Sequence, residues 1–184
     1  MPAALESLER LLVSIQAENR QQPPIENWQP ALSGDIDILI DADGRWFHEG
    51  TSISRQQLVV LFASILRREA EGYMLVTPVE KWRIQIVDHP FVSAGVTLRE
   101  EGGVPVWVLQ DNGGRQHPVC AATPLLLDQR NGQWLPYLSL ARGLSVRVSR
   151  SDYYFLVERW REAGSELLLD SAGTSFLLGH SGPL

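Results

Sequence analysis

The sequence predicts an α+β protein made of two related domains that follow an N-terminal amphipathic helix. A strand-like segment with a Gly-containing turn occurs early in the chain as ILIDADGRW and again later as LLLDQRNGQW. Each copy is followed by apolar residues at helical intervals and then by another strand-like segment. With 184 residues, the chain is long enough to form two small hydrophobic cores.

The composition of the chain excludes several functional classes. Its net charge of −6 argues against broad binding to nucleic acid, which requires many cationic contacts to phosphates. No apolar run approaches the roughly 20 residues of a membrane helix, and the acidic, leucine-containing N-terminus does not resemble a secretory signal. Cys120 is the only cysteine, which excludes an intramolecular disulfide and a cysteine-rich zinc site. We therefore expect a cytoplasmic protein that does not contact membranes.

The N-terminal segment has the apolar periodicity of an amphipathic helix with one face that needs a partner. Its stripe consists of Leu5, Leu8, Leu11, Leu12 and Ile15. The helix should end before Pro23-Pro24, which open a polar connection. We assign residues 1–24 to this helix and linker, residues 25–100 to the first repeat domain and residues 101–184 to the second.

In the first repeat, the pattern changes from helical to alternating at Asp35. Ile36, Ile38 and Ile40 alternate with other residues and predict a strand, and Asp43-Gly44 predicts the hairpin turn that follows it. Ser54 is placed to cap the next helix, which should end at Gly72. The core stripe of this helix is Leu58, Leu61, Phe62 and Ile65. Further strands are expected at 73–77, 81–87 and 91–99.

The second repeat begins after a strand at 104–109, a turn at 111–114 and a strand leading toward Cys120. Aligning Ser149 with Ser54 superposes the two helical stripes without a gap, and the second stripe is Tyr153, Leu156, Val157 and Trp160. Duplication explains this shared order better than coincidence, although any hairpin followed by a helix shows part of it. The second copy has a longer connection, within LPYLSLARGLSVRVS, between its hairpin and its helix.

Familiar catalytic and metal-binding motifs do not occur in the sequence. The IDADG turn lacks the first ligand of a calcium-binding loop, because Leu39 occupies that position, and so a simple hairpin turn is favoured. The four histidines do not have the spacing of metal ligands. Neither GxSxG nor GxxxxGK is present. We therefore expect no metal, no cofactor and no recognisable catalytic residues.

The segment TPVEKWRI concentrates charged and aromatic residues between two predicted strands. It contains Glu80, Trp82, Arg83 and Lys81, which is the only lysine of the chain. Strand alternation places Lys81 and Arg83 on one face and Glu80 and Trp82 on the other. One interpretation is a solvated edge strand with a Glu–Lys pair. The other is the cationic wall of a pocket that suits a phosphate or a base.

Four segments carry a resemblance to a known family. They are WQPALSGDIDILIDADGRWFHEGTSISR, LVTPVEKWRI, VDHPFV and LPYLSLARGL, and together they cover most of the chain from Trp28 to about Val148. In these segments the chain resembles the uncharacterised bacterial family called domain of unknown function 1285. The resemblance implies two related domains, the second similar to a pleckstrin-homology fold, with a nucleotide-like ligand at their interface and a role in signal transduction.

The positions that match the family motifs are Arg55, the Glu80-Lys81 pair, Asn112, Pro136-Tyr137 and Arg142. All of these except Pro136, together with Trp82 and Arg83, form our candidate ligand-binding set. The sequence departs from the family near Asn112, where Asp111 replaces the more frequent threonine. An acidic neighbour disfavours a phosphate at that point.

Three functional hypotheses follow, in order of preference. The first is a regulatory module in which Lys81, Arg83 and Arg142 oppose the charge of a nucleotide-like ligand, Asn112 and Glu80 form hydrogen bonds to it, and Trp82 or Tyr137 stacks on it. The second is a scaffold that docks a protein partner or a second copy of the chain, so that the protein is a monomer or a homodimer. The third is an enzyme with an unrecognised carboxylate and histidine site.

Overall fold

The computed structural model describes residues 23–130 and 133–180. The chain divides into two compact units, Met1–Asp88 and His89–Leu184, which are treated separately below. This division lies earlier in the chain than the expected boundary after residue 100, and strand β7 (Phe91–Glu101) belongs entirely to the second unit. The predicted N-terminal helix lies outside the described residues. None of the described helices is long and apolar enough to cross a bilayer.

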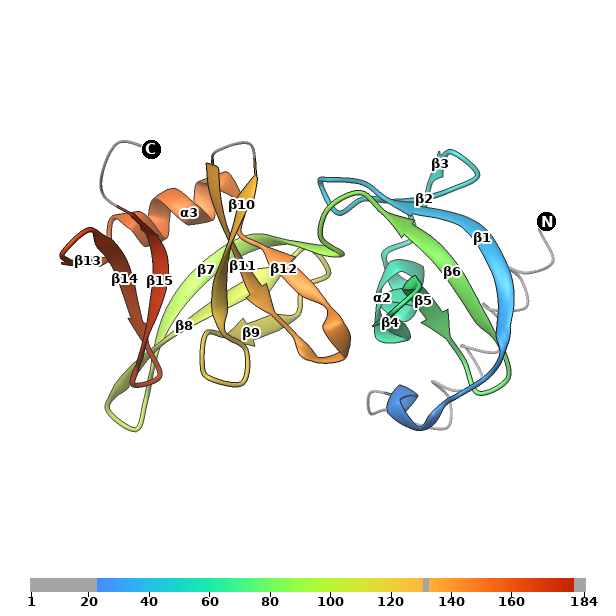
Figure 1. The fold of residues 1–184 in the computed structure, drawn as a ribbon, viewed down its shortest axis with the longest axis horizontal. Helices are drawn as coiled ribbons and strands as arrows, with labels where there is room; N and C mark the ends of the chain where they lie inside the picture. Colours follow the sequence, from blue (N-terminus) through green and yellow to red (C-terminus); the bar gives the residue numbers. More distant parts are fainter. Residues whose placement is uncertain (1–22, 131–132, 181–184) are drawn as a thin grey trace. The chain divides into compact units, whose positions relative to one another are not determined.

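The first unit contains one six-stranded sheet with the strand order β3-β2-β1-β6-β5-β4 (Figure 1). Its elements are the 3-10 helix η1 (Ile25–Asn27), β1 (Leu32–Ile40), β2 (Trp46–His48), β3 (Thr51–Ser52), α2 (Gln56–Ser64), β4 (Leu66–Glu69), β5 (Gly72–Val76) and β6 (Lys81–Ile86). Strands β1 and β6 pair in parallel, and the other neighbours pair antiparallel. The parallel pair forms because the chain crosses through α2 from β3, at one edge of the sheet, to β4, at the other edge, and returns to the centre with β6.

The core of this unit follows the alternation that predicted β1. Ile38 and Ile40 are completely buried and Ile36 is nearly so. Helix α2 packs on the sheet through its predicted stripe, and the ring of Phe62 stacks on that of Trp46 at 6.1 Å between centroids. The predicted first hairpin is confirmed, since Ile40 pairs with Trp46 across the turn.

Both main helices end earlier than expected. Helix α2 ends at Ser64, and residues predicted to continue it form β4, which makes a tight hairpin with β5 in which Glu69 pairs with Gly72. Helix α3 (Arg150–Val157) likewise ends before Trp160 and is followed by the short strand β13 (Arg161–Ala163). In each copy, pairing with the next strand overrides the local helical pattern.

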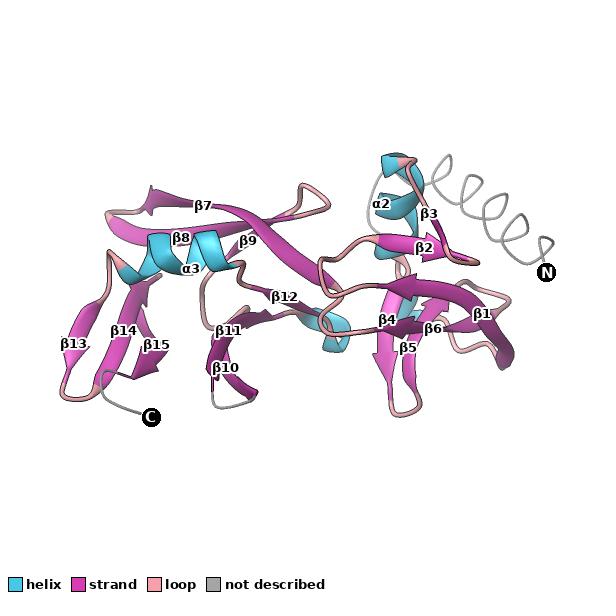
Figure 2. Ribbon diagram, turned by 90° about the horizontal axis from the view of Figure 1, so that it is seen from above, coloured by secondary structure: helices cyan, strands magenta, loops and turns pink. Residues whose placement is uncertain are grey.

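The second unit is also rich in strands, as Figure 2 shows by colour. Its remaining elements are β8 (Val104–Asp111), β9 (Gln116–Pro118), β10 (Leu125–Arg130), β11 (Gln133–Ser139), the 3-10 helix η2 (Ala141–Gly143), β12 (Ser145–Arg147), β14 (Glu166–Ser171) and β15 (Thr174–His180). One sheet has six strands in the order β10-β11-β12-β7-β8-β9, and β13-β14-β15 form a second sheet of three. The described part of the chain is therefore mostly β, with less helix than the predicted α+β class implies.

The order of elements matches the predicted duplication. Three strands, a helix and three strands run from β1 to β6 in the first unit and from β10 to β15 in the second. Strands β7, β8 and β9 precede the second copy and join it where β7 pairs in parallel with β12. The two copies thus share a scaffold and differ in what has been added to it.

Candidate functional site

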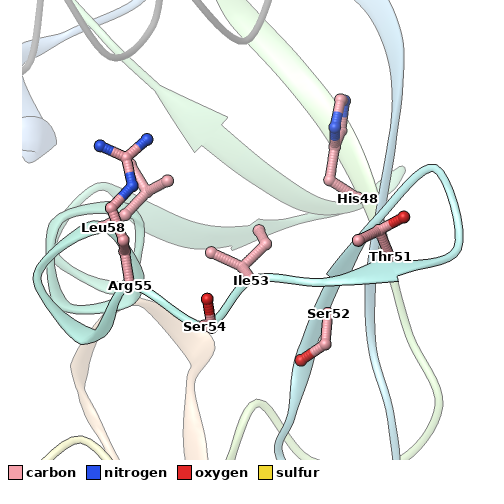
Figure 3. A pocket seen from close by; sticks show the side chains of 7 residues that line it. All are labelled: His48, Thr51, Ser52, Ile53, Ser54, Arg55 and Leu58. Atoms are coloured by element: carbon pink, nitrogen blue, oxygen red, sulfur yellow. The ribbon is translucent and has the colours of Figure 1, made fainter.

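A groove of about 230 Å³ lies between the β2–β3 hairpin and the start of α2. It is lined by His48, Thr51, Ser52, Ile53, Ser54, Arg55 and Leu58. Figure 3 shows the side chains of Arg55 and His48 rising on the same side of the segment that joins β3 to α2, while Ser52 points to the other side. These lining residues provide one guanidinium, one imidazole and three hydroxyl groups, and they include no carboxylate.

The start of α2 departs from the usual pattern of a helix N-terminus. Ser54 was expected to cap the helix, but Arg55 occupies the N-cap position, and no side chain there accepts a hydrogen bond from the first turn. The first turn also contains no acidic residue. Helix N-termini carry partial positive charge and favour anions, so a cation at this position is unfavourable by itself. The start of α2 therefore combines two features that both attract a negative group.

Lys81 has a structural partner in the first unit. Its Nζ lies 2.6 Å from Oε2 of Glu69, and Arg67 contacts the other oxygen of the same carboxylate. Burial alone would raise the pKa of Glu69, but hydrogen bonds from Lys81 and Arg67 lower it below its ordinary value. Strand β6 lies between β1 and β5, so the edge-strand interpretation of TPVEKWRI is wrong. The partner of Lys81 is Glu69 instead of the adjacent Glu80.

Trp82 lies on the opposite face of β6 from Lys81, and Glu80 lies in the turn just before this strand. A turn fixes the backbone of Glu80, because its N–H donates to Oγ1 of Thr77 and its carbonyl accepts from the Thr77 N–H. Among the described residues, Oε1 of Glu80 and Nε1 of Trp82 are buried without a hydrogen-bond partner. Arg83 lies 3.5 Å from Asp35, measured from Nε to Oδ1. Unsatisfied buried groups are uncommon in folded proteins, so this segment remains a candidate for ligand contact.

Asn112 anchors a turn to strand β7 in the second unit. Its backbone N–H donates to the carbonyl of Val92, and its Oδ1 accepts from the Val92 N–H at 3.3 Å. The preceding Asp111 is completely buried and accepts hydrogen bonds from the backbone N–H groups of Gly113 and Arg115. Asp111, the acidic neighbour that argues against a phosphate here, therefore stabilises the turn through hydrogen bonds to its backbone.

The carboxylate of Asp111 also contacts two side chains. Nε of Arg115 donates to its Oδ2 at 2.8 Å, and Nε2 of His117 lies 2.9 Å from the same oxygen. Burial alone would raise the pKa of Asp111, but the hydrogen bond from His117 and the charge of Arg115 lower it below its ordinary value. Both contacts hold the Asp111 carboxylate in place within the turn.

The same turn occurs at Asp41 in the first unit. Its carboxylate accepts from the backbone N–H groups of Asp43 and Arg45, both at 2.9 Å, and from Nε of Arg45 at 2.7 Å. The shared sequence is D-x-x-G-R, at 41–45 and at 111–115. In contrast, the hairpin of β10 and β11 pairs Arg130 with Gln133 across a shorter turn. The sequence signal for this structural repeat was present, but the comparison of ILIDADGRW with LLLDQRNGQW missed it.

Tyr137 and Arg142 lie in the longer connection of the second copy. The ring of Tyr137 packs against that of His89, with 5.1 Å between centroids. His89 is buried, and its Nδ1 lies 2.7 Å from Oγ of Ser145. Arg142 adopts a left-handed backbone conformation with φ of 64°, which is unfavourable for a residue with a side chain. Such conformations often occur at functional sites.

The candidate set is therefore distributed over both units. The first contains Arg55 in the groove, Glu80 in the turn before β6, and Lys81, Trp82 and Arg83 in β6 itself. The second contains Asn112, Tyr137 and Arg142. Whether a single ligand touches both groups stays a prediction. Among the described residues, no cluster of His, Cys, Asp and Glu is suited to hold a metal ion.

Comparison with known proteins places the chain in a family. The model described as "Domain of unknown function (DUF1285), N-terminal domain" matches residues 23–89, and that described as "Protein of unknown function (DUF1285), C-terminal domain" matches residues 90–178. The chain belongs to the DUF1285 family. The boundary between the two matches agrees closely with the division of this DUF1285 protein into two compact units.

Two solved structures are similar to this DUF1285 protein. A family member from Silicibacter pomeroyi DSS-3 is 34% identical with a TM-score of 0.81, and the match covers 88% of this chain and 90% of that one. A member from Shewanella baltica OS155 is 28% identical with a TM-score of 0.53, and the match covers 67% of this chain and 92% of that one. No curated protein matches the chain.

Proposed function

We propose that this DUF1285 protein is a regulatory module that binds a small phosphate-bearing ligand, with a phosphate in the groove at the start of α2. The observation that carries this proposal is Arg55, which stands at a helix N-terminus without a side-chain cap and lines a groove with hydroxyl groups. Exposed backbone N–H groups at a helix N-terminus form a ready anion-binding site. A guanidinium beside them adds a donor suited to phosphate oxygens.

The size of the groove indicates which part of a ligand it can hold. Its volume of about 230 Å³ is below the 300–1,000 Å³ typical of sites for complete small molecules. We infer that it takes a phosphate group, and that the remainder of a nucleotide-like ligand contacts other residues. The carboxylate of Glu80 and the indole of Trp82 are suited to hydrogen-bond a base, and Arg83 is suited to oppose further charge.

The broader predictions extend this proposal. A role in signal transduction and a pleckstrin-homology-like second unit remain predictions from the family resemblance, and a cytoplasmic location remains a prediction from the composition. Binding of a phosphate-bearing ligand is compatible with each of them.

The test is thermal unfolding in the presence of inorganic phosphate, pyrophosphate and nucleoside monophosphates at millimolar concentration. A ligand that binds only the folded protein raises the midpoint of unfolding. We expect such a rise for the wild type and its loss in Arg55→Ala. Arg150→Ala is the matched control, because Arg150 opens α3, whose N-terminus has its own side-chain cap. No rise with any compound, or an equal rise in Arg55→Ala, would contradict the proposal.

A further inference from the structure

Strand β7 loses one of its two neighbours part-way along its length. Phe91 and Val92 pair with β12 on one side, whereas β8 pairs with the other side along most of the strand. The register between β7 and β8 shifts between Ser93 and Gly95, which places a β-bulge at Ala94. Within the described ranges, no strand pairs with the β12 side of β7 after Val92. Residues 95–101, called the β7 edge below, are therefore open on that side.

The β7 edge is exposed as well as unpaired on one side. Thr97, Arg99, Glu100 and Glu101 are exposed, and the apolar Leu98 is 54% exposed. In Figure 2 the strand runs along one side of the second unit with β8 beside it. An edge strand presents a row of N–H and C=O groups that can pair with another strand. Because proteins normally keep such edges short or cover them, this long open edge indicates a partner strand.

The side chains of the β7 edge show which pattern the partner strand needs. Strand alternation places Val96 and Leu98 on one face and Thr97 and Arg99 on the other. Leu98 lies opposite the buried Trp107 of β8, so the face of Leu98 is the apolar one. A partner strand should therefore alternate between apolar and polar residues in the same way. The β7 edge of a second copy has this alternation.

The charges of the β7 edge select one register for pairing with itself. Two copies related by a two-fold axis pair antiparallel with one residue opposite itself. When Leu98 is that residue, residue 95 of one copy lies opposite residue 101 of the other, so the whole β7 edge is paired. Arg99 then lies opposite Thr97, and both glutamates lie opposite uncharged residues. Centring the pair on Arg99 or Glu100 instead places two like charges opposite each other, which is destabilising.

We propose that the β7 edge pairs antiparallel with the β7 edge of a second copy of this chain, with Leu98 opposite Leu98 at the two-fold axis. This pairing provides partners for the open backbone groups and removes two exposed leucines from water. A single pair of strands forms a small interface, so the dimer should dissociate on dilution. The pairing is independent of phosphate binding at Arg55, because β7 belongs to the second unit.

The test is sedimentation velocity of the full chain at micromolar to millimolar concentration. We expect a monomer–dimer equilibrium for the wild type. Leu98→Lys should raise the dissociation constant by about tenfold or more, because it opposes two ammonium groups and removes an apolar contact. Leu98→Glu should have the same effect. Leu126→Lys is the matched control, because Leu126 is 40% exposed on the edge strand β10, and it should leave the equilibrium unchanged.

Mixing Leu98→Lys chains with Leu98→Glu chains tests the register itself. Opposite charges then meet at the axis, so the mixture should dimerise more tightly than either variant alone. A wild type that stays monomeric throughout overturns the proposal and leaves the β7 edge to a strand of another protein. A dimer that resists Leu98→Lys, responds equally to Leu126→Lys, or is not restored by mixing also overturns it.

Discussion

Helices α2 and α3 hold the same place in the two copies, but their N-termini differ in chemistry. In α3, Oγ of Ser149 accepts from the backbone N–H of Asp152 and donates to its carboxylate. That carboxylate also accepts from Oγ of Ser93 at 2.5 Å, and Asp152 is only 8% exposed. In α2, Arg55 stands at the N-cap, no side chain caps the first turn, and no acidic residue lies in it.

The difference shows that the same scaffold can have a capped helix N-terminus in one copy and an uncapped one in the other. The second copy provides an internal anion at its helix N-terminus, which stabilises the helix. The first copy has neither a side-chain cap nor an acidic residue at this point, and its groove is lined by Arg55, so we expect it to favour an anion from outside. Departures from local stability rules of this kind are expected at functional sites.

The largest expected effect comes from removing the internal anion of α3. Asp152→Ala leaves the hydroxyls of Ser93 and Ser149 without their charged acceptor, and we expect the free energy of unfolding to fall by about 2–3 kcal/mol. Urea unfolding measures this change. Asp170→Ala is the control, because Asp170 pairs with Arg161 at the surface, where the loss should be below about 1 kcal/mol. Equal losses in the two variants would mean that the cap of α3 is not a special feature.

Arg55→Asp should make α2 resemble α3. An aspartate at the N-cap accepts from the first-turn N–H groups and complements the helix dipole, so the free energy of unfolding should rise by about 1 kcal/mol. The same variant should lose its thermal response to phosphate. Arg150→Asp should give no gain in stability, because α3 is already capped. A loss of stability in Arg55→Asp would show that the arginine is needed for the fold.

Arg142→Gly tests the connection that only the second copy contains. Glycine adopts the left-handed conformation of this position without steric cost, so the free energy of unfolding should rise by up to about 1 kcal/mol. Ala141→Gly is the matched neighbour and should destabilise, because it only adds backbone freedom. The free energies of unfolding of the two variants, measured by chemical denaturation, should therefore change in opposite directions. A clear loss in Arg142→Gly would assign its side chain a stabilising role greater than the backbone strain.

Gln57→Asp should have the smallest effect. A carboxylate in the first turn of α2 favours the helix by about 0.5 kcal/mol and competes with an external anion. We expect a slightly higher midpoint of thermal unfolding without phosphate and a smaller rise with it. Gln57→Glu should act in the same direction, and Gln57→Ala should leave the phosphate response intact. An undiminished response in both acidic variants would place the anion away from the first turn.

Much of the scaffold could be predicted from the sequence because it depends on local patterns. Alternating isoleucines predicted β1, and the helical stripe predicted the face that α2 buries. The element order of the two copies followed from the same patterns. Strand β4 was missed because Leu66 continues the apolar pattern of the helix, and only its pairing with Leu75 in β5 makes it a strand. The Ser54 cap was wrong because the helix begins later than the pattern suggested.

The candidate site was less predictable because it depends on contacts between distant residues. The pair of Lys81 with Glu69 spans a β-hairpin, and neither residue indicates the other in the sequence. Arg55 was singled out by the family resemblance. Only the three-dimensional structure shows that α2 has no side-chain cap at this position and that Arg55 lines a groove. The D-x-x-G-R turn was readable in the sequence, and its recognition required comparing Asp111 with Asp41.

The most direct test of the account follows backbone amide signals by NMR during titration with inorganic phosphate. The account predicts that the amides of Gln56, Gln57 and Leu58 shift on binding, that those of Ser151, Asp152 and Tyr153 do not, and that Arg55→Ala removes the effect. Equal shifts at both helices, or shifts at α2 that persist in Arg55→Ala, would contradict it.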